Sequence, residues 1–179
     1  MPVVAGGPAP RPGSKEDLFL DDAVRDARAE GPALEIGCGV GRGTFDLAAR
    51  CGDAIGVDRS VARLRRARNV QTAEEFLLPV EGESRDEVAI DLSKLERTRA
   101  VFAVASSSLL PSADGVFSTV VLRLKDGEGP WPDPAAALAE ARRVTTAGGT
   151  LLLEEPPSKP GDIPVFRVAR VPTGAAAPR

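Results

Sequence analysis

Histidine and tyrosine are absent from this 179-residue chain, and there are only two cysteines and one tryptophan. The lack of histidine removes the commonest general base and excludes histidine-based triads and most zinc sites. The two cysteines, Cys38 and Cys51, cannot build a disulfide framework. No base adjoins either cysteine in the sequence, so a reactive thiol is not expected. We therefore predict no metal site and interpret both cysteines as packing residues.

Long apolar runs and an excess of positive charge are also missing. No run approaches the length of a membrane span, and residues 1–7 lack the charged start and apolar core of a signal peptide. A net charge of −3 and an isoelectric point near 5.2 give no nucleic-acid footprint. The basic run at residues 63–68 is interpreted as a solvated helix face, with a phosphate or RNA contact as the alternative. We predict a cytoplasmic protein without membrane or nucleic-acid partners; its oligomeric state is left open.

The composition, with 42% hydrophobic and 27% charged residues, indicates one globular domain. Residues 1–13 are dense in proline and glycine and are predicted to be a flexible arm. Residues 14–156 are predicted to form the domain. Residues 157–179 form a tail rich in proline, glycine and alanine. Within it, the period-two alternation at residues 165–171 predicts one edge strand.

A glycine stands at every second position from Gly37 to Gly43, directly after a short apolar strand at residues 33–36. A second apolar strand at residues 54–57 ends in Asp58. In an α/β sheet this order places a nucleotide pocket at the carboxyl ends of the first two strands. Glycine lets the backbone turn tightly and approach a ligand closely. Asp58 could accept both hydroxyls of a ribose, and its alternative role is a helix cap.

The glycine spacing separates the candidate nucleotides. The dinucleotide fingerprint G-x-G-x-x-G/A fits no register, because its last position falls on Arg42, Thr44 or Asp46. The pattern is instead E-x-G-x-G-x-G starting at Glu35, which resembles the first motif of class I S-adenosylmethionine-dependent methyltransferases. An NAD-dependent oxidoreductase is the less favoured alternative.

The resemblance continues in the order expected for that family and covers roughly residues 31–156. Residues 101–106 resemble the third strand and its turn, residues 110–121 the run into strand four, and residues 133–153 the helix and strand five. The resemblance implies a doubly wound, mostly parallel, Rossmann-like α/β sheet with strand order 3-2-1-4-5, shortened at its C-terminal end. Strands are predicted at residues 33–36, 54–57, 101–105, 117–122 and 150–154, and helices at residues 15–30, 44–49, 60–69 and 134–144.

The family resemblance also implies the cofactor, S-adenosylmethionine, and its contacts. Glu35 would help to fix the methionine end of the cofactor, and Asp58 would hold the ribose. The implied cofactor-binding residues are Glu35, Gly37, Cys38, Gly39, Gly41, Asp58, Arg59, Ser106, Ser107 and Leu122. The methyl group of this cofactor sits on an activated sulfonium, so the enzyme mainly positions the acceptor in line. Methyl transfer to a small-molecule acceptor is therefore compatible with the lack of histidine.

Three features depart from the family pattern. Ser106 stands where the family usually has an Asp that bonds the adenine amino group, and Ser118 replaces the usual acid before strand four. Residues 123–132 match no active-site motif. These departures keep open a second hypothesis, a non-catalytic relative that binds the cofactor weakly or acts as a partner subunit. No catalytic residue is identified. Asp126, Glu128 and Asp133 are candidate bases by position, and each is better interpreted as a turn or cap residue. Trp131 could line an acceptor pocket, although covering the sheet edge is the preferred interpretation.

Residues 71–99 differ from the minimal family pattern. Two short apolar runs, at residues 75–80 and 87–92, flank a turn and predict an inserted hairpin. Some bacterial members of the family carry a similar insert at this point.

Overall fold

The computed structural model describes residues 31–73, 75–79, 87–92, 95–123, 133–155 and 165–173. The predicted arm, the predicted helix at residues 15–30, and the candidate residues Asp126, Glu128 and Trp131 lie outside these ranges. None of the helices in the described ranges has the length and apolarity needed to cross a membrane.

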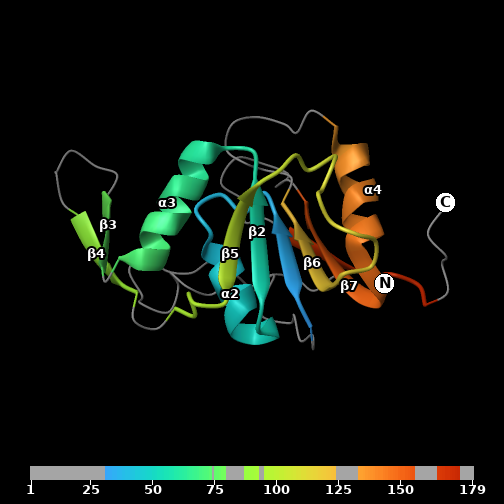
Figure 1. Ribbon diagram of the computed structural model, residues 1–179, viewed down its shortest axis with the longest axis horizontal. Coiled ribbons are helices and arrows are strands. Elements are labelled where there is room, and N and C mark those ends of the chain that lie inside the picture. Colours follow the sequence, from blue (N-terminus) through green and yellow to red (C-terminus); the bar gives the residue numbers. More distant parts are fainter. Residues whose placement is uncertain are drawn as a thin grey trace.

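A six-stranded sheet forms the centre of the protein, with strand order β5-β2-β1-β6-β7-β8 (Figure 1). Five of its strands run parallel, and the edge strand β8 runs antiparallel to β7. This order is the predicted 3-2-1-4-5 arrangement with one antiparallel strand added, so the predicted fold class is confirmed. The strands are β1 (Ala33–Ile36), β2 (Ala54–Asp58), β5 (Ala100–Val104), β6 (Phe117–Leu122), β7 (Thr145–Glu155) and β8 (Val165–Arg170).

Both faces of the sheet are covered, because successive strand residues point to opposite sides. Helices α2 (Arg42–Cys51) and α3 (Val61–Thr72) pack on one face, in an apolar cluster that includes Phe102 and Val121. Helix α4 (Pro134–Val144) packs on the other face, in a cluster that includes Val120. The neighbours Val120 and Val121 thus belong to different cores, as expected for a doubly wound sheet.

Two helices begin at or next to their predicted first residues, and each has a side-chain cap. The Ser60 hydroxyl accepts a hydrogen bond from the Arg63 N–H at the start of α3, and the Asp133 carboxylate accepts one from the Ala136 N–H at the start of α4. Pro134 occupies the first turn of α4, where its missing N–H costs nothing. Helix α2 begins at Arg42, two residues before its predicted start.

Strand β7 begins at Thr145, directly after α4, and not at residue 150 as predicted. Its first residue pairs with Phe117, and the register then shifts so that Thr119 pairs with Thr150. Gly148, with φ of 79°, lies inside the extra length. The predicted strand starts after Gly148 and Gly149, whereas the chain accommodates both glycines as a bulge within the strand.

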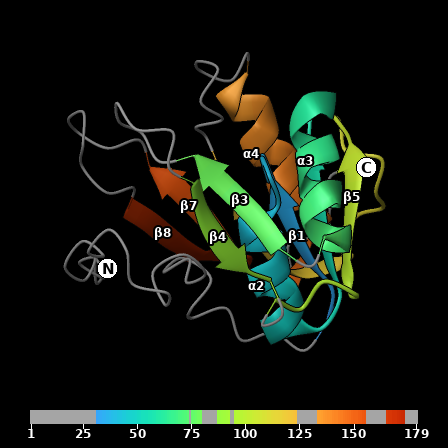
Figure 2. The ribbon, with the colours of Figure 1, turned by 90° about the vertical axis from the view of Figure 1, so that its left-hand side faces the viewer.

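The predicted hairpin is formed by β3 (Glu75–Pro79) and β4 (Glu87–Asp91), which pair antiparallel as a separate two-stranded sheet. In Figure 1 this hairpin lies beyond α3 at the end of the molecule. Figure 2 views the molecule from that end and shows the two strands running in opposite directions in front of the main sheet.

Candidate functional site

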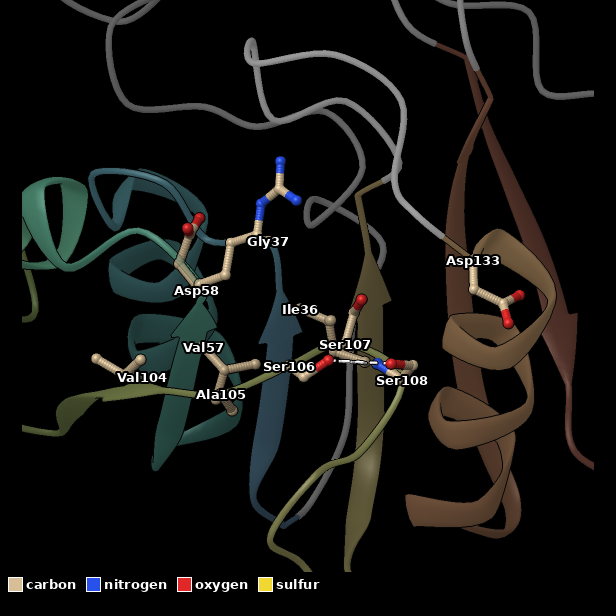
Figure 3. Close-up of a pocket in the computed structure, with 11 residues that line it drawn as sticks. Ile36, Gly37, Val57, Asp58, Val104, Ala105, Ser106, Ser107, Ser108 and Asp133 are labelled. Carbon is tan, nitrogen blue, oxygen red and sulfur yellow. Dashed lines mark hydrogen bonds between the residues drawn. The ribbon is translucent and has the colours of Figure 1, made fainter.

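A pocket of about 340 Å³ opens at the carboxyl ends of β1, β2 and β5, where ligands bind in open α/β sheets. Figure 3 shows Asp58 and Asp133 on opposite sides of it. Between them lie Ser106, Ser107 and Ser108, which we name the serine turn. Five of the predicted cofactor-binding residues line this pocket: Gly37, Asp58, Arg59, Ser106 and Ser107. The other lining residues are Ile36, Val57, Val104, Ala105, Ser108 and Asp133.

Asp58 is the last residue of β2, and only 3% of its surface is exposed. Its Oδ2 accepts a hydrogen bond from the Gly39 N–H at 2.9 Å, and its Oδ1 accepts one from the Ser60 N–H at 2.8 Å. The carboxylate therefore joins the glycine turn to the turn before α3. Ser60, and not Asp58, is the N-cap of α3. Each carboxylate oxygen has a second lone pair, so Asp58 can still accept ribose hydroxyls.

The glycines of the turn serve different purposes. Gly37, Gly39 and Gly41 all have positive φ, at 81°, 56° and 89°, which favours glycine. A Cβ added to Gly41 would lie 2.5 Å from the Phe102 ring, whereas a Cβ added to Gly39 would meet no atom within 4 Å. Gly41 thus allows α2 to pack against β5, while Gly39 borders open space.

Glu35 points away from the pocket lined by Ile36, toward the face of the sheet that α2 covers. It is 1% exposed, and its Oε2 accepts a hydrogen bond from the Thr44 hydroxyl at 2.6 Å. Its Oε1 pairs with Nε of Arg123 at 2.5 Å. Burial raises the pKa of the Glu35 carboxyl to about 8 and lowers the pKa of the Arg123 guanidinium. The Arg123 partner was not predicted from the sequence.

Cys38 is buried beside the glycine turn, and burial raises the pKa of its thiol. A thiol of this kind is unreactive, in agreement with its interpretation as a packing residue. Leu122 is 1% exposed and packs in the cluster that α4 covers. The pocket is not lined by the other five predicted cofactor-binding residues, Glu35, Cys38, Gly39, Gly41 and Leu122. Their contacts with the cofactor stay predictions.

The serine turn follows β5. The Leu109 N–H donates to the Ser106 carbonyl at 3.3 Å, and the Ser106 and Ser108 hydroxyls lie 3.0 Å apart (Figure 3). The Ser108 N–H also donates to the Ser106 hydroxyl, at 3.4 Å. The exposed Ser106 hydroxyl thus bonds within its own turn, where it retains the capacity to accept a further donor.

Arg143 of α4 fixes the segment that leaves the serine turn, a role not predicted from the sequence. Its guanidinium donates to the carbonyls of Ser112 and Leu110, at 2.8 and 3.2 Å, and pairs with Asp114 at 2.6 Å. It also donates to both oxygens of Glu140, which in turn accepts the Leu110 N–H at 2.8 Å. These bonds lower the pKa of Glu140. The only signal in the sequence is the i,i+3 spacing of an acid and a base on a predicted helix.

Ser118 and Asp133 also have defined places. The Ser118 hydroxyl donates to the Pro32 carbonyl at 3.2 Å and so holds the chain before β1. Asp133 caps α4, as preferred from the sequence, and it also lines the pocket.

A mostly parallel sheet with a glycine turn after its first strand, a buried acid after its second and a pocket over both is the arrangement of a Rossmann-like fold. Residues 34–153 match the family model described as "Methyltransferase domain". The chain therefore belongs to this family of class I S-adenosylmethionine-dependent methyltransferases. No curated protein matches the sequence.

Solved structures share the fold at low sequence identity. The YcgJ protein from Bacillus subtilis has a TM-score of 0.55 and 21% identity over 73% of this chain and 46% of its own. A SAM-dependent methyltransferase from Methanosarcina mazei has a TM-score of 0.54 and 24% identity over 77% of this chain and 58% of its own. The [4+2]-cyclase SpnF has a TM-score of 0.53 and 18% identity over 72% of this chain and 40% of its own. This chain thus spans about half the length of these proteins. Because one of them is described as a cyclase, the fold alone does not determine the reaction.

Proposed function

We propose that this protein transfers a methyl group from S-adenosylmethionine to a small-molecule acceptor. The observation that carries the proposal is the position of Asp58. Its buried carboxylate holds the glycine turn through the Gly39 N–H and, at the same time, lines the pocket. An acid at the end of the second strand is where a ribose is held in this class of sheet.

The residues present fit such a cofactor. The open space at Gly39 leaves room for a ligand against the backbone. The pocket continues from Asp58 past Val57 and Val104 to Ser106, which gives an apolar wall with a polar end suited to a purine. The pocket thus has a hydrogen-bond acceptor for a ribose at Asp58 of β2 and one for an adenine at Ser106, after β5.

The bound cofactor would supply a methyl group on a positively charged sulfur with a neutral leaving group. The chain's own contribution is then to hold the adenosine and to place the acceptor in line. Asp133 lies on the pocket wall with its carboxylate fixed by the Ala136 N–H. It is the candidate for orienting a donor group of the acceptor, because it is a fixed acid on the far side of the pocket from Asp58 (Figure 3).

Thermal unfolding with S-adenosylhomocysteine and with NAD tests the cofactor. At a hundred times its dissociation constant, S-adenosylhomocysteine should stabilise the fold by about 2.7 kcal/mol. A shift with NAD and none with S-adenosylhomocysteine would contradict the proposal. Catalysis is then tested by incubating the protein with S-adenosylmethionine and a broad panel of acceptors and measuring S-adenosylhomocysteine.

A non-catalytic relative that binds the cofactor is the second candidate function. The observation that favours it is the Ser106 hydroxyl, which replaces an acid and bonds within its own turn. Tight binding of S-adenosylhomocysteine together with no product above background across the acceptor panel would select this alternative.

A further inference from the structure

Helix α3 carries arginines that the proposed function does not use. The 23 bases and 26 acids of the chain are unevenly distributed, because residues 59–72 hold five arginines and no acid. Three of these arginines, Arg65, Arg66 and Arg68, lie at exposed positions of α3. We name these three residues the arginine row.

The arginine row has no partner within the described part of the chain, where its three guanidiniums make no hydrogen bond and no ion pair. By contrast, the exposed Arg99 pairs with Asp53 at 3.1 Å. Arg65 and Arg68 are three positions apart and are therefore neighbours on the helix surface, where like charges destabilise a helix. The positive charge of the row is thus left uncompensated and is open to an anionic partner.

The helix that carries the row is fixed at both ends. The Ser60 hydroxyl caps its start. At its other end, the Arg97 guanidinium donates to the Val70 carbonyl at 3.1 Å and to the Ala73 carbonyl. The Gln71 amide donates to the Arg97 carbonyl at 2.9 Å. Figure 1 shows α3 beside β5, between the main sheet and the hairpin. A preformed surface of this kind loses little conformational entropy when it binds a partner.

The side chains beside the row indicate which anionic partner it fits. The other exposed residues of α3 are Val61, Ala62, Asn69 and Thr72; none is aromatic, and only Val61, at the start of the helix, is a large apolar residue. A protein interface is built around apolar or aromatic anchors, and a helix on a membrane surface inserts apolar side chains. A single-stranded nucleic acid stacks its bases on aromatic rings. The phosphate backbone of a duplex requires only positive charge, and the planar guanidinium binds a phosphate through two hydrogen bonds.

We propose that the arginine row binds the phosphate backbone of a double-stranded nucleic acid, independently of base sequence. This interaction is separate from the proposed function, because none of the three arginines lines the pocket. The net charge of −3 disfavours such a partner for the molecule as a whole. A duplex that lies against one face, however, meets the charge of that face, since the Debye length is about 8 Å at physiological ionic strength and more distant acids are screened.

Fluorescence anisotropy of labelled RNA and DNA duplexes measures this binding with the intact protein. If each arginine of the row contacts one phosphate, the logarithm of the affinity should fall with the logarithm of the salt concentration with a slope of about −2.7 between about 50 and 200 mM salt. Duplexes of unrelated sequence should bind equally, and the comparison of RNA with DNA identifies the preferred form.

Three results would overturn the inference. If neither duplex binds at the lowest salt concentration, the row is only a solvated helix face. If polyglutamate competes as strongly as unlabelled duplex, the surface does not select phosphate. If vesicles of anionic lipid compete as strongly as the duplex, the partner is a membrane surface.

A variant with Arg65→Gln, Arg66→Gln and Arg68→Gln combined tests the row itself. Glutamine favours a helix as arginine does, so α3 should be retained. We expect the affinity for the duplex at the lowest salt concentration to fall at least roughly tenfold and the salt slope to approach zero. The midpoint of thermal unfolding should not fall, because like charges are removed from the helix. Unchanged affinity of the folded variant would overturn the role of the row.

The matched control combines Arg99→Gln, Arg142→Gln and Arg170→Gln, which remove the same charge from exposed positions outside α3. This variant should bind the duplex with close to the native affinity and salt slope. An equal loss of affinity in both variants would mean that only the net charge matters, and would overturn the inference. If the variant of the row does not fold, the salt slope and the competition experiments on the native protein decide.

Discussion

At one end of the pocket the Asp58 carboxylate is buried and accepts two backbone N–H groups, while at the other end the Ser106 hydroxyl is exposed and bonds within its own turn. The first arrangement is tied to the backbone of two turns, so a change there disturbs the fold as well as the ligand. The second arrangement involves side chains at the surface, where a substitution usually changes the stability of the fold little. We propose that the Asp58 end of the pocket holds the ribose and the Ser106 end the adenine, so that substitutions at Asp58 should affect both stability and binding and substitutions at Ser106 mainly binding.

The sharpest contrast in binding is expected at the glycine turn. Gly39→Val should abolish binding of S-adenosylhomocysteine, because its side chain would fill the open space that the ligand needs. Gly39→Asn is a useful second variant, since Asn tolerates the left-handed backbone better than Val does. Binding is measured by calorimetry on folded protein. If the Asn variant binds normally, the turn does not touch the ligand.

Gly41→Ala provides the matched control for Gly39. Its methyl group would collide with the Phe102 ring, and overpacking of this kind costs about 1–3 kcal/mol. We expect a lower free energy of unfolding in urea, with ligand affinity retained in the folded fraction. Lost binding at unchanged stability would show that Gly41, too, contacts the ligand.

Asp58→Asn should weaken S-adenosylhomocysteine by roughly 30-fold, because hydrogen bonds to a charged acceptor contribute about 2 kcal/mol. The amide would also face one of the two N–H groups that the carboxylate now accepts, so some loss of stability is expected. Titration of the ligand into the variant and into Asp53→Asn, an exposed acid, separates the two effects. An affinity equal to that of the control would remove Asp58 from the ribose site.

At the other end of the pocket, Ser106→Asp should tighten S-adenosylhomocysteine by roughly tenfold, since a charged acceptor bonds an amine more strongly than a hydroxyl does. The aspartate can also accept the Ser108 N–H that Ser106 accepts now. Ser106→Ala should weaken binding by only a few-fold, because a single neutral hydrogen bond is lost. An unchanged or weaker affinity of the Asp variant would mean that the adenine is not bound at this turn.

The smallest effect on binding is expected at Arg143, which supports the serine turn from α4. Arg143→Met should lower the free energy of unfolding by about 2 kcal/mol, because Glu140 and the Leu110 carbonyl lose a charged partner. We expect the affinity for S-adenosylhomocysteine to fall only a few-fold. Arg142→Met, on the exposed side of the same helix, is the control, and equal stability of the two variants would contradict this role for Arg143.

The helix starts at Ser60 and Asp133 could be predicted from nearby residues, whereas the order of the sheet strands was implied by the family resemblance. Strands β1 and β6 and helix α4 match their predicted bounds, since apolar periodicity and an N-cap three residues from its donor are local signals. The glycine turn and Asp58 were likewise identified from their spacing and their places at the ends of strands.

Only the tertiary structure decided which partner each site residue has. Glu35 and Arg123 are 88 positions apart and meet because β1 and β6 are neighbours in the sheet. Gly39 and Gly41 look alike in the sequence, and the Phe102 ring, contributed by β5, separates their roles. The predicted start of β7 was wrong because Gly148 and Gly149, which are typical of a turn, form a bulge against β6. A local pattern specifies how a segment folds, but charge partners, burial and close contacts depend on which segments the sheet brings together.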